Sequence, residues 1–141
     1  MKVKVLFTGK TTDPWIRQGV DEYAGRIRHY APFELVELKD DDQMLKYVRS
    51  SDHLILLDEH GTEFSSVAWA RNLEQKAAHL PKDWVFAIGG PYGFPPAVQE
   101  RADECLSLSR MTFSHQLVRL VFLEQLYRAF TIIKGEKYHH E

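Results

Sequence analysis

Leu108-Ser109-Arg110-Met111-Thr112-Phe113-Ser114-His115-Gln116 is a polar stretch that leads straight into a long apolar segment, and these two features decide the fold. The apolar segment predicts a helix from about Gln116 to Lys134, with apolar side chains on nearly all of its sides. A helix of this kind is buried on more than one side. Because a small domain offers little extra cover, we expect a second subunit to pack against it.

The rest of the chain alternates between strand patterns and helix patterns. Apolar runs predict five strands, at residues 2–8, 33–38, 53–57, 84–88 and 106–109. Helix-start signals follow the first four strands, at Pro14, at Asp40, at Ser65 or Ser66, and at Pro95. This alternation indicates a single α/β domain over residues 1–141, with a mainly parallel sheet flanked by helices.

A glycine-rich turn, Gly89-Gly90-Pro91-Tyr92-Gly93, follows the predicted strand at residues 84–88. Tight turns account for one or two glycines, and a ligand close to the backbone would account for three within five residues. The turn lacks the spacing of a dinucleotide-binding fingerprint. Ligands of open α/β sheets bind outside the carboxyl ends of the strands, where this turn and residues 108–116 both belong. We therefore expect a ligand pocket between them.

The composition narrows the class of protein. The chain is 44% hydrophobic and 27% charged, with a formal net charge of −2, so a phosphate-bearing partner would have to use local basic patches. Cys105 is the only cysteine, which excludes an internal disulfide and a multi-cysteine zinc site, and we expect no metal. No signal peptide or long apolar run is present, so we expect a cytoplasmic protein without a membrane or DNA partner.

Three further groups are candidates for chemistry. Asp58-Glu59-His60 ends a predicted strand, where carboxylates are either solvated or act as acid and base. His115 and Arg119 are four residues apart and share one helix face. His115 could instead bond to the backbone at a helix start, and Arg119 could pair with Glu124 or a neighbouring subunit. The closing segment 138–140 (Tyr-His-His) carries groups that can stack on a base and hydrogen-bond to it.

Several of these segments together resemble one family. They are Ile88-Gly89-Gly90-Pro91 with Gly93, the stretch from Leu106 to Arg119, the stretch from Glu124 to Ala129, and Tyr138-His139. The sequence is similar here to the ribosomal RNA large-subunit methyltransferase H family, within the SPOUT superfamily of knotted α/β methyltransferases. The similarity spans the whole chain and is densest from residue 84 onward.

The resemblance implies a fold, a reaction and partners. The fold would be a SPOUT-type α/β knot, with a C-terminal trefoil knot, in a homodimer. The reaction would be N3-methylation of a pseudouridine of large-subunit (23S) rRNA on the assembled ribosome, with S-adenosylmethionine as methyl donor. Carried over by motif, the cofactor contacts would be Leu57, Gly89, Leu108, Ser109, Arg110, Met111, Thr112 and Phe113.

The same resemblance suggests catalytic roles. Arg119 or Arg110 would stabilise charge on the base, and His139 or His115 would remove the N3 proton or orient the base. Tyr138 would stack on that base. Two readings compete with this one: a related SPOUT methyltransferase that acts on tRNA, and a ribosome-associated binding protein that has the fold without the catalysis. Tyr92 and His140 depart from the family pattern, and His140 replaces a residue that is usually basic.

Overall fold

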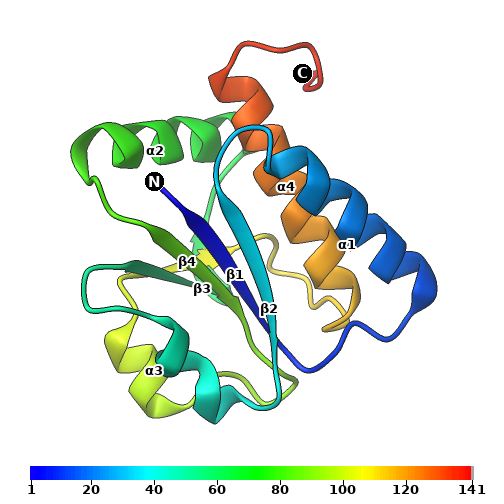
Figure 1. Ribbon diagram of the computed structural model, residues 1–141, viewed down its shortest axis with the longest axis vertical. Coiled ribbons are helices and arrows are strands. Elements are labelled where there is room, and N and C mark those ends of the chain that lie inside the picture. Colours follow the sequence, from blue (N-terminus) through cyan, green and yellow to red (C-terminus); the bar gives the residue numbers. More distant parts are fainter. Residues whose placement is uncertain (141) are drawn as a thin grey trace.

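The computed structural model describes residues 1–140, and strands and helices alternate along it as the sequence predicts (Figure 1). The first half contains β1 (Val3–Thr8), α1 (Pro14–Ile27), β2 (Phe33–Leu38), the 3-10 helix η1 (Asp41–Tyr47) and β3 (His53–Glu63). The second half contains α2 (Ser66–His79), β4 (Trp84–Ile88), α3 (Pro96–Arg101), β5 (Glu104–Ser107) and α4 (Leu117–Ile133). The α/β prediction is confirmed.

Two predicted strands differ from the structure. The strand predicted at residues 53–57 continues to Glu63 as β3, with a shift in register between Leu57 and Thr62, so Asp58-Glu59-His60 lies within it. The last strand is shifted. The sequence places the last strand at residues 106–109, whereas β5 ends at Ser107. The single proton of the Ser107 hydroxyl is shared between the carbonyls of Ser109 (2.9 Å) and Glu59 (3.2 Å), and these contacts turn the chain away from the sheet. The polar stretch from Leu108 to Gln116 is therefore a connection between β5 and α4.

All five strands are parallel, in the spatial order β2-β1-β4-β3-β5. Their carboxyl ends consequently lie at one edge of the sheet. From the outer strand β5, the chain returns past this edge to α4, which packs against α1 and α2. This return from an outer strand is consistent with the C-terminal knot that the resemblance implies, an exception to ordinary chain topology.

The two faces of the sheet have separate cores. Along β1, Val5 and Phe7 pack toward α1, α2 and α4, while Leu6 packs toward η1 and α3. In β4, Phe86 belongs to the core under α1, α2 and α4, and Val85 belongs to the core under η1 and α3. Successive side chains of a strand point to opposite faces of the sheet. Three helices therefore cover one face, and two short helices cover the other (Figure 1).

The helix α4 is buried against two neighbours but retains apolar surface. Phe122, Leu123 and Leu126 are fully buried between the sheet, α1 and α2. Several other apolar side chains of α4 are only half-buried: Val118, Leu120, Val121, Tyr127, Ile132 and Ile133. Cover from a second subunit, which the sequence predicts, stays a prediction. Within residues 1–140, no helix is both long and apolar enough to span a bilayer.

Candidate functional site

A cavity of about 440 Å³ lies at the carboxyl ends of β3, β4 and β5. After β3 the chain passes to α2 on one face of the sheet. After β4 it passes to α3 on the opposite face, which α3 shares with η1. Two neighbouring strands whose connections leave on opposite faces open a crevice between them, which is where α/β sheets bind ligands. The cavity occupies this crevice, and its size is that of a small-molecule site.

Glycines form one wall of the cavity. Gly89 and Gly90 follow β4, and the Gly93 N–H donates to the Gly90 carbonyl (3.3 Å) to close a tight turn. Gly93 has φ +81°, a left-handed conformation that favours glycine. A Cβ at Gly89 would lie 3.1 Å from the ring of Phe94. The wall therefore presents bare backbone because a larger residue would crowd the turn.

The loop from Leu108 to His115 forms the opposite wall. The Thr112 hydroxyl donates to a Glu59 carboxylate oxygen (2.9 Å), which ties the loop to the chain after Leu57. The Met111 N–H donates to the Ser109 hydroxyl (3.0 Å) and shapes the loop locally. The cavity thus has an apolar floor from the strand ends and hydroxyl groups along the loop.

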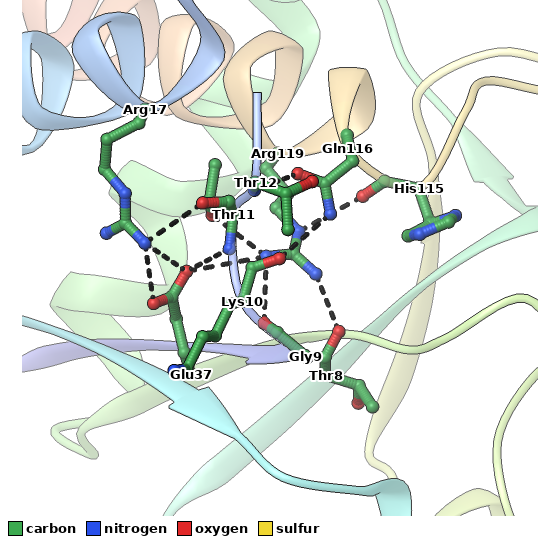
Figure 2. A network of polar contacts seen from close by, with 10 residues as sticks. All are labelled: Thr8, Gly9, Lys10, Thr11, Thr12, Arg17, Glu37, His115, Gln116 and Arg119. Atoms are coloured by element: carbon green, nitrogen blue, oxygen red, sulfur yellow. Dashed lines mark hydrogen bonds and ion pairs between the residues drawn. The ribbon is translucent and has the colours of Figure 1, made fainter. Parts of the chain in front are cut away.

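Behind the cavity, Arg119 fastens the start of α4 to the end of β1 (Figure 2). Its side chain is 1% exposed and donates to the carbonyls of Thr8 (2.6 Å) and Gly9 (3.0 Å). It also donates to the Thr11 hydroxyl (2.9 Å) and the His115 carbonyl (3.2 Å). All of these hydrogen bonds of the guanidinium are made within the protein. They fix the position of the start of α4 relative to the end of β1, two segments that are distant in sequence.

Glu37 supplies the counter-charge to this arginine. Its carboxylate lies 3.6 Å from the Arg119 guanidinium and accepts from the Thr11 N–H (2.6 Å) and from Arg17 (3.0 Å). Burial alone would raise the pKa of Glu37, but the hydrogen bonds from Thr11 and Arg17 outweigh it, and its pKa is lowered. Burial lowers the pKa of Arg119, while Glu37 opposes that shift. The pair therefore remains ionic.

Gln116 makes a second link between the same segments. Its amide nitrogen donates to the Lys10 carbonyl (3.0 Å), and its amide oxygen accepts from the Thr12 N–H (2.8 Å). Figure 2 shows the His115 ring pointing away from this network, while Gln116 points into it. Because Gln116 is fixed and the His115 carbonyl accepts from Arg119, the backbone of His115 is held at the rim of the cavity, which His115 helps to line.

The comparisons with known proteins identify the family. Residues 1–139 match a family model described as "Predicted SPOUT methyltransferase". The chain belongs to the SPOUT methyltransferase family. A relative from Geobacter sulfurreducens named "Ribosomal RNA large subunit methyltransferase H" is 46% identical, with 99% of this chain and 100% of the relative covered. Relatives of the same name from Parabacteroides distasonis and Cytophaga hutchinsonii are 43% and 46% identical, with 99–100% of this chain and 100% of each relative covered.

In this SPOUT methyltransferase, the predicted cofactor contacts largely converge. Arg110 is exposed and is not among the residues that line the cavity. The other predicted contacts all line the cavity: Leu57, Gly89, Leu108, Ser109, Met111, Thr112 and Phe113. The glycine turn and the polar loop predicted where the pocket lies, and the family resemblance supplied the individual contacts. The aromatic wall at Phe94 was missed, because a single phenylalanine after a turn carries no local signal.

The four predicted catalytic residues of the SPOUT methyltransferase separate into three places. His115 lines the cavity, and Arg119 lies behind it among backbone carbonyls. Tyr138 and His139 lie on the far part of α4, beside Tyr127 and Arg128. From Val118, which lines the cavity, to Tyr127 is roughly 14 Å along the helix axis, at 1.5 Å rise per residue. The single chain therefore does not bring all four together.

The sequence left open, as an alternative to a catalytic role, that Arg119 pairs with Glu124 or a neighbouring subunit. Glu124 pairs instead with Arg128 (2.6 Å), and Arg119 pairs with Glu37. The reason is that the Arg119 side chain points toward the end of β1, a neighbour that no local spacing reveals. Within the described residues 1–140, no three His, Cys, Asp or Glu side chains gather where they could hold a metal ion.

Proposed function

We propose that this chain transfers the methyl group of S-adenosylmethionine to N3 of a pseudouridine in large-subunit (23S) rRNA, on the assembled ribosome. The single observation that carries the proposal is the cavity at the ends of β3, β4 and β5. It is lined by the same residues, Arg110 excepted, at which the family's motif would contact the methyl donor. Family membership and this coincidence support the same reaction.

The residues present fit S-adenosylmethionine. The backbone at Leu57 and Gly89 can meet the edges of an adenine ring, and Ile88 and Leu106 provide an apolar surface for its face. The hydroxyls of Ser109, Thr112 and Ser114 suit the ribose and amino-acid parts of the molecule. Apolar walls with a few placed polar groups are typical of cofactor sites.

When bound, S-adenosylmethionine supplies a methyl group on an activated sulfonium. The protein's task is to align the acceptor nitrogen and to manage its proton. His115, at the cavity rim, is the described candidate nearest the donor site for accepting the N3 proton. The contacts of Arg119 favour a positioning role, because they hold His115 and the loop rather than face the cavity. Arg110 is exposed beside the rim and is free to approach rRNA.

We propose that the active protein is a homodimer, and that Tyr138 and His139 act in the partner's site. The tail after α4 (residues 136–140) and the cavity of one protomer lie at different levels along α4. Half-buried apolar residues of α4 provide surface for a second subunit. If the tail takes part in catalysis, a neighbouring copy has to deliver it. In this arrangement each complete site combines residues of two protomers.

A methyl-transfer assay tests the proposed function. Purified protein and S-adenosylmethionine are incubated with assembled ribosomes, free subunits and tRNA, and the modified nucleoside is identified by mass spectrometry. We expect N3-methylated pseudouridine from assembled ribosomes. Methylation of tRNA would favour the related SPOUT reaction. Ribosome binding without methylation, and without a thermal shift by S-adenosylmethionine or S-adenosylhomocysteine, would favour the binding protein.

Replacing Gly89 with valine is expected to weaken S-adenosylmethionine binding by at least about tenfold, which corresponds to 1.4 kcal/mol. The branched side chain would enter the cavity and press on Phe94, whose ring lies 3.1 Å from the Cβ position. Isothermal titration calorimetry measures the affinity. Tyr92→Ala is the matched control, because Tyr92 is 97% exposed in the same turn, and its cofactor affinity should match the wild type. Equal affinities for both variants would contradict the assigned wall.

Mixed dimers test whether the tail acts in the partner's site. Gly89→Val and His139→Ala homodimers should both transfer methyl groups poorly. The first binds the methyl donor weakly, and the second lacks the imidazole of His139. A mixed dimer joins an intact cavity on one protomer to an intact tail on the other. We therefore expect activity to return when the two variants are unfolded and refolded together. If activity stays as low as that of the separate variants, the tail acts in the site of its own protomer or takes no part in catalysis.

A further inference from the structure

The segment after α4 is anchored, although chain termini usually fray. Gly135 has φ +70°, and the Glu136 N–H donates to the Thr131 carbonyl (2.9 Å), which ends the helix and reverses the chain. Figure 1 shows the following residues curling back over this end of the α1–α4 pair. We define residues 136–140 as the tail. Its side chains then meet a set of tyrosines on the same protomer.

Tyr30 holds the beginning of the tail. Its hydroxyl donates to a Glu136 carboxylate oxygen (2.7 Å), and its ring stacks on Phe130 with centroids 5.5 Å apart. Burial and the bond to Glu136 raise the pKa of Tyr30 to about 12, so the hydroxyl remains a donor at neutral pH. A stacked ring cannot swing away, so it gives Glu136 a fixed partner.

Tyr23 and Tyr127 hold the middle of the tail. The Tyr138 hydroxyl lies 3.3 Å from that of Tyr23, and its ring meets the Tyr127 ring edge-on at 4.7 Å. Arg128 lies over the Tyr138 ring (4.8 Å) and 3.0 Å from the His139 Nδ1. Burial and the hydrogen bond between the Tyr138 and Tyr23 hydroxyls raise the pKa of Tyr138. Both residues proposed for chemistry are thus set in place by their own protomer.

We infer that Tyr23 and Tyr30 are positioning residues, which hold the tail in a fixed conformation for use in the partner's cavity. The inference rests on the proposed function. A free tail would lose backbone and side-chain entropy each time it entered a site, whereas an anchored tail has lost it during folding. The tyrosines therefore act on turnover through Tyr138 and His139, without contacting the methyl donor.

The test uses Tyr30→Phe, Glu136→Ala and the double variant, in the full-length dimer. Each single variant removes the one charge-assisted hydrogen bond between Tyr30 and Glu136 and leaves the cavity residues unchanged. We expect each to lower kcat on ribosomes by about tenfold, with the affinity for S-adenosylmethionine and the unfolding midpoint unchanged. Hydrogen exchange of residues 136–140 should quicken in both. The double variant should be no slower than either single variant, because one contact is lost in each case.

Tyr47→Phe is the matched control, since Tyr47 is 37% exposed and lies on η1, away from the tail. It should keep wild-type turnover and tail exchange. The inference is overturned if Tyr30→Phe keeps full turnover, or if a loss of stability accounts for the whole loss of turnover. It is also overturned if the effects of the two single variants on turnover add in the double variant. A wild-type protein that methylates no ribosome would overturn the proposed function itself, and the inference with it.

Discussion

Arg119→Ala is expected to lower the free energy of unfolding by about 3–5 kcal/mol, the usual cost of breaking a buried ion pair by removing one partner. The substitution leaves the carbonyls of Thr8 and Gly9 without their donor and opens space behind the cavity. Glu37 would lose the charge that lies 3.6 Å away in the interior. Urea unfolding followed by circular dichroism measures the change.

Arg17→Ala is the control for this prediction. Arg17 bonds to the same Glu37 carboxylate, but its side chain is 40% exposed, so its loss should cost less than about 1 kcal/mol. The free energy of unfolding of Arg119→Lys should lie between those of the two variants. An ammonium keeps the charge but cannot reach all the carbonyls that the guanidinium contacts. If Arg119→Ala were no less stable than Arg17→Ala, the network in Figure 2 would not hold the fold together.

Gly61→Ala is expected to cost about 3 kcal/mol or more, at the upper end of the penalties for overpacking. A Cβ at Gly61 would lie 2.7 Å from the backbone carbonyl carbon and oxygen of Cys105, and 2.8 Å from the carbonyl carbon of Leu106. These are backbone atoms of β5, where β3 pairs with it across an irregularity in register. They cannot move aside as a flexible side chain would, so β5 must shift.

The shift should also reach the cavity. Leu57 and Leu106 belong to this strand pair and line the site, so Gly61→Ala should weaken S-adenosylmethionine binding along with stability. Gly25→Ala is the matched control, because a Cβ at Gly25, in α1, meets nothing within 4 Å. There alanine should stabilise by roughly 0.5–1 kcal/mol through helix propensity. Unfolding midpoints that fall equally for both variants would contradict the contact.

The sequence predicted the cavity well because its signals are local. A strand that ends in Gly89-Gly90 and a polar loop before an apolar helix can both be read within a few residues. Parallel strands then bring the two features to the same edge of the sheet, whatever the strand order is. The fold class followed from periodicity in the same way. The predicted bounds of the last strand were wrong, because the Ser107 hydroxyl turns the chain through a contact with the Glu59 carbonyl, which is far away in sequence.

The role of Arg119 shows where local reasoning ends. Its partners Thr8, Gly9 and Glu37 precede it by some 80 residues or more in sequence, and spacing along α4 offered only Glu124 as an alternative partner within the helix. Only the packing of α4 beside α1, at the end of β1, brings them within hydrogen-bond distance. A buried guanidinium must then satisfy its donors with whatever carbonyls lie there.

The sequence by itself determined the class of fold, the edge of the sheet that carries the site and most of the residues that line it. Each of these depends on patterns of a few residues: strand period, helix period and glycine. The tertiary structure decided that β4 lies between β1 and β3, that Arg119 is buried, and that the tail lies apart from its own cavity. These depend on contacts between distant segments, whose free energy is set by packing in three dimensions and leaves no local trace in the chain.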